Sequence, residues 1–163
     1  MKTLTIGDLK ARIPIIQGGM GVAISLSGLA SAVANEGGIG VISAAGLGLL
    51  YKKLSPSNYT EAGNLGLAEE IRKAREKAKG IIGVNVMVAL SDFAELVKTS
   101  IAEKVDIIFS GAGLPLDLPS FLKKDSVTKL VPIVSSARAV RIICEKWKNN
   151  YDYLPDAVVL EGP

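Results

Sequence analysis

Short aliphatic runs alternate with longer segments of helical periodicity along the whole chain, and this alternation restricts the folds that the chain can adopt. The pattern is typical of parallel βαβ units, in which each helix crosses back over the sheet between two strands. At 163 residues, 48% of them hydrophobic, the chain is long enough for one domain with a sizeable core. We predict a single α/β domain over residues 1–163, with six strands near residues 14–17, 39–43, 81–86, 105–110, 130–134 and 157–160.

Helices are predicted between these strands from capping residues and periodicity. Ser27, Ser91 and Ser136 are the expected N-caps of three helices, because a serine hydroxyl can accept a hydrogen bond from a free amide of the first turn. A fourth helix is expected over residues 67–79, where apolar residues recur at helical spacing. Residues 44–66 are polar and contain glycine, which predicts a long loop that is either a substrate lid or variable surface.

Composition excludes several classes of function. The 19 basic and 16 acidic residues give a formal charge of +3 without a dense basic run, so nucleic-acid binding is not expected. Residues 13–35 are uncharged, but their proline, glycines and polar residues argue against a membrane helix. The single cysteine, Cys144, indicates a reducing, cytoplasmic setting. The chain contains no histidine, the commonest general base and metal ligand.

Small or hydrogen-bonding residues follow each predicted strand. Ligands of parallel α/β folds bind at the carboxyl ends of the strands, so these residues are expected to share one edge of the sheet. Turns between strands and helices favour glycine and serine in any case, so an edge without a ligand stays open as the alternative. The residues are Gly18, Gly19, Met20 and Gly21 after the first strand, then Ser43, Asn85, Ser110, Gly111, Gly113, Ser135 and Glu161.

Common nucleotide and metal motifs do not account for these residues. A dinucleotide fingerprint built on Gly19 and Gly21 needs a third small residue at position 24, where the chain has Ile24. A fingerprint starting at Gly111 fails in the same way at Leu116, and no Gly-Lys-Ser or Gly-Lys-Thr sequence marks a phosphate-binding loop. No cluster has the spacing of a zinc or calcium site, so no metal is expected.

Six segments of the chain resemble, in order and spacing, the nitronate monooxygenase or 2-nitropropane dioxygenase family. They are PIIQGGMG at 14–21, GGIGVI at 37–42, GVNV at 83–86, SGAG at 110–113, VPIVSS at 131–136 and AVVLEGP at 157–163. The resemblance implies a parallel (β/α)8 TIM barrel that holds FMN at the carboxyl ends of its strands. The chain is then an incomplete, N-terminal portion of such a barrel, with five βα units and a sixth strand.

The resemblance also implies roles for individual residues. Gly19, Met20 and Gly21 correspond to a backbone wall beside the flavin ring, and the amide of Asn85 is expected to reach the flavin or its surroundings. No catalytic residue is assigned, because the sequence stops before the histidine that serves as the family's base. Further cofactor-binding positions implied by the resemblance are Ser110, Gly111, Gly113, Ser135 and Glu161.

The activity implied by the resemblance is the oxidation of an alkyl nitronate, with FMN and O2, to a carbonyl compound and nitrite. The isolated chain is expected to be weakly active or inactive, because closing such a barrel takes about 250 residues. Uncovered strand edges would favour association with another chain, so a homo-oligomer is possible on this interpretation. Two alternatives stay open: a flavin-dependent enoyl-acyl carrier protein reductase acting on an enoyl-thioester, and a non-catalytic half-barrel that binds a metabolite or partner.

Overall fold

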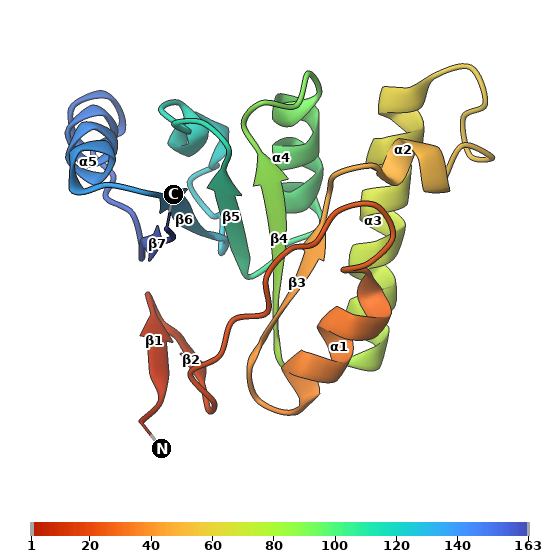
Figure 1. Cartoon of the computed structure of the whole chain (residues 1–163), viewed down its shortest axis with the longest axis horizontal. Coiled ribbons are helices and arrows are strands. Elements are labelled where there is room, and N and C mark those ends of the chain that lie inside the picture. The colour runs from red at the N-terminus through yellow and green to blue at the C-terminus, as the bar shows by residue number, and fades with distance from the viewer. Residues whose placement is uncertain (1, 163) are drawn as a thin grey trace.

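The centre of the molecule is a curved sheet of five parallel strands that carries its helices on the outer side (Figure 1). The computed structural model describes residues 2–162 of the chain. The strands lie side by side in chain order and every neighbouring pair is parallel, which is the winding of a (β/α) barrel that is not closed. The predicted α/β fold is confirmed. The strands are β3 (Ile39–Ser43), β4 (Ile81–Met87), β5 (Ile107–Gly111), β6 (Lys129–Val134) and β7 (Val159–Leu160).

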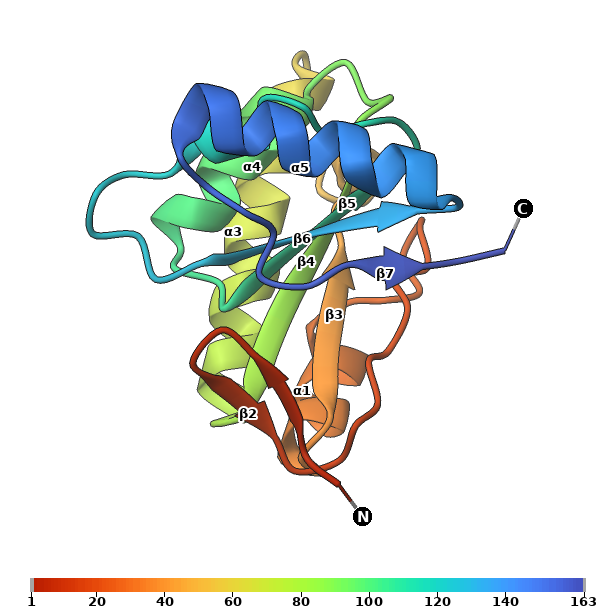
Figure 2. The same cartoon turned by 90° about the vertical axis from the view of Figure 1, so that its left-hand side faces the viewer.

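Helices connect successive strands and form the outer layer (Figures 1 and 2). The predicted cap of the last helix is confirmed, since the Ser136 hydroxyl accepts a hydrogen bond from the Ala139 amide at 3.2 Å. The caps predicted at Ser27 and Ser91 are wrong: neither helix has a side-chain cap, and Ser27 is itself the first helical residue. The helices are α1 (Ser27–Asn35), α2 (Leu47–Leu50), α3 (Tyr59–Lys77), α4 (Phe93–Ala102), α5 (Ala137–Tyr151) and the 3-10 helix η1 (Leu118–Phe121).

Residues 44–66 are not the long loop predicted from the sequence. They contain α2 and the first half of α3, whose cap is Asn58, accepting a hydrogen bond from the Glu61 amide at 3.0 Å. Glycines within this stretch suggested a loop, but they serve close packing. A Cβ at Gly66 would lie 2.5 Å from the Tyr51 ring, so glycine lets this ring pack directly on the helix.

An antiparallel hairpin of β1 (Leu4–Ile6) and β2 (Leu9–Ala11) was not predicted. It covers the inner side of the sheet near the amino ends of the strands (Figure 2). Gly7 makes its turn with a φ of +57°, a conformation that favours glycine. Asp8 forms an ion pair with the Lys129 Nζ at 2.6 Å, which ties the hairpin to β6.

The first predicted strand, at residues 14–17, is only partly formed. A single parallel bridge joins Ile16 to Ile39, although the Gln17 amide donates to the Ile39 carbonyl at 3.0 Å and keeps the segment beside β3. The other five predicted strands are present, with ends that differ by at most two residues. The segment therefore lies where the first strand of a barrel belongs without being a regular strand.

Both faces of the sheet are buried, each against a different part of the chain. Successive side chains of a strand point to opposite faces, so alternate residues belong to different cores. The outer core packs beneath the helices and includes Ile42, Val84, Ile108, Leu130 and Trp147. The inner core packs against the hairpin and consists of Ile6, Ala11, Ile39, Val41, Ile107, Phe109 and Val131.

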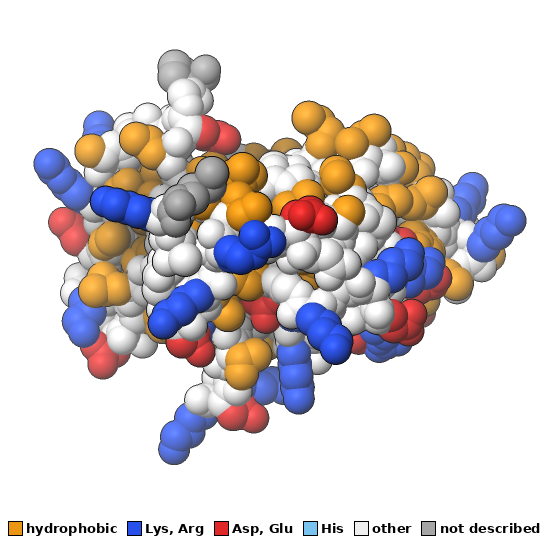
Figure 3. All heavy atoms as spheres, turned by 90° about the horizontal axis from the view of Figure 1, so that it is seen from below, with side chains coloured by type: hydrophobic (Ala, Val, Ile, Leu, Met, Phe, Trp, Pro, Cys, Tyr) orange, Lys and Arg blue, Asp and Glu red, His pale blue; other side chains and the backbone are white. Residues whose placement is uncertain are grey.

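The face that contains the hairpin and the amino ends of the strands is seen from below in Figure 3. Its Lys and Arg side chains are spread over the face rather than gathered together. This face therefore has no concentrated basic patch of the kind that nucleic-acid binding uses. Within residues 2–162, no helix combines the length and the apolar composition needed to cross a membrane.

The contact between α1 and β3 depends on a glycine and gives a test of the fold. A Cβ at Gly40 would lie 1.8 Å from the Ala30 carbonyl oxygen, so Gly40→Ala must displace α1. We expect a loss of about 3 kcal/mol in the free energy of unfolding, measured with urea. Gly28→Ala is the matched control, because nothing lies within 4 Å of its Cβ position; its stability should stay equal or rise by up to about 1 kcal/mol. Equal effects of the two substitutions would contradict this packing.

Candidate functional site

The glycine turn, residues 18–21, lies against the carboxyl ends of β3 and β4. A Cβ at Gly19 would lie 2.5 Å from the Cβ of Asn85, so only glycine permits this approach. At Gly21, a Cβ would lie 3.9 Å from the Ser43 Oγ. The turn and the two strand ends therefore form one surface, although they are far apart in the sequence.

Two side chains that were not predicted as site residues hold this turn in place. The Gln17 Oε1 accepts a hydrogen bond from the Val41 amide at 3.1 Å, and its Nε2 donates to the Val41 carbonyl at 3.0 Å. The Ser25 Oγ accepts from the Met20 amide at 2.9 Å and donates to the Gly18 carbonyl at 3.2 Å. The Gln17 Nε2 also donates to the Ser25 Oγ at 2.9 Å. The bonds of Gln17 fasten the start of the turn to β3, and those of Ser25 close the turn on itself.

The turn presents open backbone and apolar side chains to its free side. Nothing lies within 4 Å of a Cβ position at Gly18, while Met20 is 63% and Ile24 60% exposed. Val22 and Ala23 have φ values of +36° and +66°, which residues other than glycine rarely adopt and which occur preferentially at functional sites. The result is a largely apolar surface with accessible backbone.

Asn85 supplies a polar group beside this surface. It is half-buried and pairs in register with Ser43 of β3 and Phe109 of β5. No hydrogen bond joins its side-chain amide to another of residues 2–162. The polar atoms of this amide are accessible, because the described residues contain no buried side-chain N or O atom that lacks a partner. The amide is therefore open to a ligand and can both donate and accept a hydrogen bond.

The side chain of Ser110 does not face this surface, so any contact of Ser110 with a cofactor, which stays a prediction, would have to come from its backbone. It is fully buried, and its Oγ donates to the Val86 carbonyl at 3.0 Å. Its place follows from strand alternation, since Phe109 belongs to the inner core and Ile108 to the outer one. Ser110 shares the parity of Ile108, so its hydroxyl lies in the outer layer. Counting residues along the strand would have indicated this.

Gly111 and Gly113 serve close packing between neighbouring strand ends. A Cβ at Gly111 would lie 2.9 Å from the Ile133 Cβ, and one at Gly113 would lie 3.0 Å from the Val88 Cβ. Gly113 is exposed and has a φ of +136°, which requires glycine. Contact of either residue with a cofactor stays a prediction.

Ser135 and Glu161 lie at the other end of the same edge. Ser135 follows β6, and Glu161 follows β7, where its amide donates to the Val134 carbonyl at 3.0 Å. In Figure 1 the C-terminal end lies on the left and the glycine turn, drawn in orange-red, on the right. The structure thus brings Gly19 and Asn85 together but leaves Ser135 and Glu161 across the sheet. No group of three or more potential metal ligands occurs in the described part of the chain.

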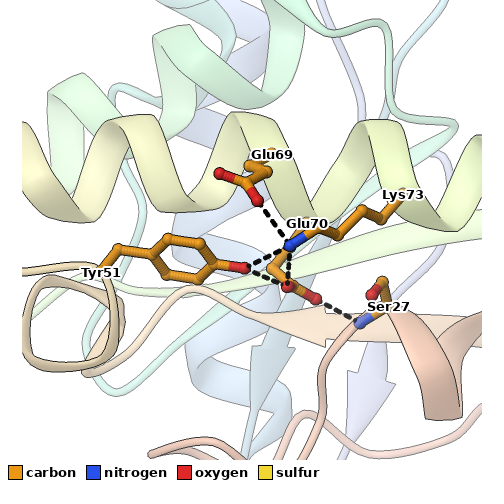
Figure 4. A network of polar contacts seen from close by, with 5 residues as sticks. All are labelled: Ser27, Tyr51, Glu69, Glu70 and Lys73. Carbon is orange, nitrogen blue, oxygen red and sulfur yellow. Dashed lines mark hydrogen bonds and ion pairs between the residues drawn. The ribbon is translucent and has the colours of Figure 1, made fainter. Parts of the chain in front are cut away.

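A buried carboxylate supports the start of α1, directly after the turn (Figure 4). Glu70 of α3 accepts hydrogen bonds from the Ser27 amide at 2.6 Å and from the Tyr51 hydroxyl. Lys73 Nζ lies 3.7 Å from the Glu70 carboxylate and 2.5 Å from that of Glu69. A negative charge at the amino end of a helix is favourable because of the helix dipole. The network joins α1, α2 and α3 at the point where the turn enters α1.

The pKa of Glu70 lies below its ordinary value. Burial acts to raise this pKa, but the hydrogen bonds from Tyr51 and Ser27 and the charge of Lys73 outweigh it. Burial and the neighbouring carboxylate raise the pKa of Tyr51, which keeps its hydroxyl protonated as a donor. Glu70 is therefore ionised at neutral pH and acts as a fixed acceptor for the start of α1.

Comparisons with known proteins agree with this fold. The family model described as nitronate monooxygenase matches residues 2–163. Two solved structures of FabK from Thermotoga maritima, one of them a point mutant, have TM-scores of 0.67 and 0.70 and identities of 28% and 30%. A nitroalkane oxidase from Streptomyces ansochromogenes has a TM-score of 0.68 and 16% identity, which shows similarity of fold.

The similar structures are longer than this chain. Each match covers 91% of this chain but only 40%, 42% and 46% of the respective structures. The chain therefore spans less than half of their length. Among curated proteins, no match to the chain was found.

The contact between the glycine turn and Asn85 can be tested with neighbouring glycines. Gly19→Ala should lower the free energy of unfolding by about 1–3 kcal/mol, because its Cβ would overlap Asn85. Gly18→Ala, whose Cβ meets open space, should change it by less than about 0.5 kcal/mol. Urea unfolding measures the difference, and the NMR signals of the Asn85 side-chain amide should shift only in the first variant. A shift of similar size in both would argue against the contact.

The Glu70 network predicts a pH-dependent contribution to stability. Because the pKa of Glu70 is lower in the folded protein, its stabilising effect is present above the ordinary value of 4.5 and is lost as the pH falls through the folded value. The parent protein should therefore be more stable than Glu70→Gln above about pH 5, and this difference should shrink in acid. Glu76→Gln, on an exposed position of the same helix, is the control and should follow the parent at every pH. A difference that is constant down to acid pH would refute the assignment.

Proposed function

The chain belongs to the nitronate monooxygenase family, and on that premise we propose that it forms part of an FMN-dependent oxidoreductase. The proposed reaction is the oxidation of an alkyl nitronate with O2 to a carbonyl compound and nitrite. The observation that carries the proposal is the approach of Gly19 to Asn85 at the carboxyl edge of the sheet, beside the open backbone of Gly18. This is the edge at which barrel enzymes bind their ligands.

The residues at this edge fit the ring of a flavin. A flat ring needs accessible backbone and apolar surface to lie on, and the open Cβ position at Gly18 and the exposed apolar side chain of Met20 provide them. The ring also needs hydrogen-bonding partners at its rim, and the free amide of Asn85 supplies a donor and an acceptor. When bound, a flavin supplies the electron transfer of the reaction, while the protein contributes binding, orientation and electrostatics.

The phosphate group of FMN requires a different set of residues. The site residues proposed for the cofactor include no lysine or arginine, and Glu161 carries a negative charge. Backbone amides or residues outside this set must therefore bind the phosphate. In barrels of this kind, the loops after the seventh and eighth strands commonly do so.

The proposed substrate is an anion, and this suits the chemistry of the chain. A nitronate has already lost the proton that a neutral nitroalkane must give up to a base. The side chains of Met20 and Asn85 and the glycines of the turn include no basic group. Their part in the proposed reaction is therefore to position the flavin and the substrate.

Enoyl-thioester reduction is the second candidate function. It is the other activity that the sequence resemblance implies, and the comparisons do not favour the nitronate reaction over it. The nitroalkane oxidase is 16% identical to the chain, whereas FabK is 28–30% identical. The two reactions differ in their electron acceptor, which is O2 in the first and the enoyl group in the second.

Flavin binding tests the proposed site. FMN added to a protein that contains this chain within a complete barrel should show quenched fluorescence and a shifted visible spectrum, and Asn85→Ala should weaken its binding about tenfold. Ser110→Ala is the control, because the Ser110 hydroxyl lies in the outer layer; its affinity for FMN should be unchanged. Absence of flavin binding would instead favour a non-catalytic half-barrel. Equal losses of FMN affinity in the two variants would show that Asn85 is not part of the site.

Substrate assays separate the two reactions. A protein that contains this chain within a complete barrel should consume O2 in the presence of propyl-2-nitronate. Oxidation of NADH or NADPH that depends on an enoyl-thioester, without O2 uptake on the nitronate, would establish the reductase in its place.

A further inference from the structure

The outer layer contains a groove of about 720 Å³ that is separate from the edge described above. It lies between the second half of α4 and the segment 120–127, which includes the end of η1. None of the residues proposed for the cofactor lines it. Its volume is in the range of small-molecule sites, which is about 300–1,000 Å³.

The groove exists because one helix of the outer layer is very short. The connection from β5 to β6 contains only η1, of 4 residues, whereas α1, α3, α4 and α5 have between 9 and 19. After η1 the chain returns to β6 without a helix and arcs outward next to α4 (Figure 2). The flank of α4 is therefore not covered as it would be by a full helix.

The floor of the groove is apolar and held by the core. Phe121 packs edge-on against Phe93, with ring centroids 6.4 Å apart, and Ile101 and Leu122 pack against the outer core. Val127 also lines the groove, and its side chain is 56% exposed to solvent. An aliphatic chain lying here would bury this apolar surface, which is favourable in proportion to the area removed from water.

The rim of the groove is basic. Lys98, Lys104 and Lys123 line it, with Asp125 as the one acidic residue among its lining. Within residues 2–162, none of the three lysines forms an ion pair. Lys98 Nζ lies 5.9 Å from the centre of the Phe121 ring, so a positive charge is held directly at the border of the apolar floor.

We propose that this groove binds a single-chain amphiphile with a carboxylate head group, such as a fatty acid. The aliphatic chain lies along Phe121 and Val127, and the carboxylate is held by the lysines at the rim. Charge complementarity selects this occupant: the net positive rim meets an anion, and the floor meets an apolar tail. The proposal does not depend on flavin binding, because the groove and the carboxyl edge share no residues.

Calorimetric titration of the purified chain with dodecanoate, below its micelle concentration, tests the proposal. One dodecanoate should bind per chain, and acetate, which lacks the aliphatic tail, should not bind. Dodecyltrimethylammonium, which has an aliphatic tail but a cationic head, should bind at least about tenfold more weakly than dodecanoate. The double variant Lys98→Gln and Lys104→Gln should weaken dodecanoate binding about tenfold. Lys53→Gln, at an exposed position outside the groove, is the control and should leave it unchanged.

A second variant tests the floor independently of the lysines. Val127→Asp places a negative charge on an exposed position of the floor, where it should abolish dodecanoate binding and leave the circular dichroism spectrum unchanged. The proposal is overturned if dodecanoate does not bind to the parent protein, or if this variant or the double lysine variant binds it as tightly as the parent does. Equal affinity for the anionic and cationic amphiphiles would overturn it as well, because the rim would then play no part.

Discussion

Burial of the parallel sheet on both faces is the constraint on which the rest of the structure depends. The helices close the outer face over residues such as Ile108, and the hairpin closes the inner face over Phe109. The middle of the sheet is covered on both sides, so binding groups are presented at its carboxyl edge, where Asn85 is half-buried and Met87 is 37% exposed. The glycine turn lies on this edge, and the absence of a Cβ at Gly19 lets it rest on Asn85.

Support for the turn comes from side chains behind it. Gln17 bonds both backbone groups of Val41, Ser25 closes the turn on itself, and Glu70 fixes the first amide of α1. Sites of this kind need such support, because a ligand gains little from groups that must first be ordered. The turn is therefore a preorganised surface rather than a flexible loop end.

Much of this fold follows from local sequence patterns, and the exceptions have physical causes. The five strands were predictable because aliphatic runs buried on both faces have few alternatives. The hairpin was missed because its strands have only three residues each, although Gly7-Asp8 between two apolar runs is a recognised turn signal. The roles of Gln17 and Ser25 could not be predicted, since they depend on contacts with backbone that only the folded chain brings near.

The central claim is that the glycine turn and Asn85 form the ring side of a flavin site. A crystal structure with FMN, of this chain or of a longer protein that contains it, tests the claim most directly. The account predicts that the flavin ring lies in van der Waals contact with the backbone of residues 18–21 and within hydrogen-bond distance of the Asn85 amide. A flavin bound elsewhere on the protein, with this edge left free, would contradict it.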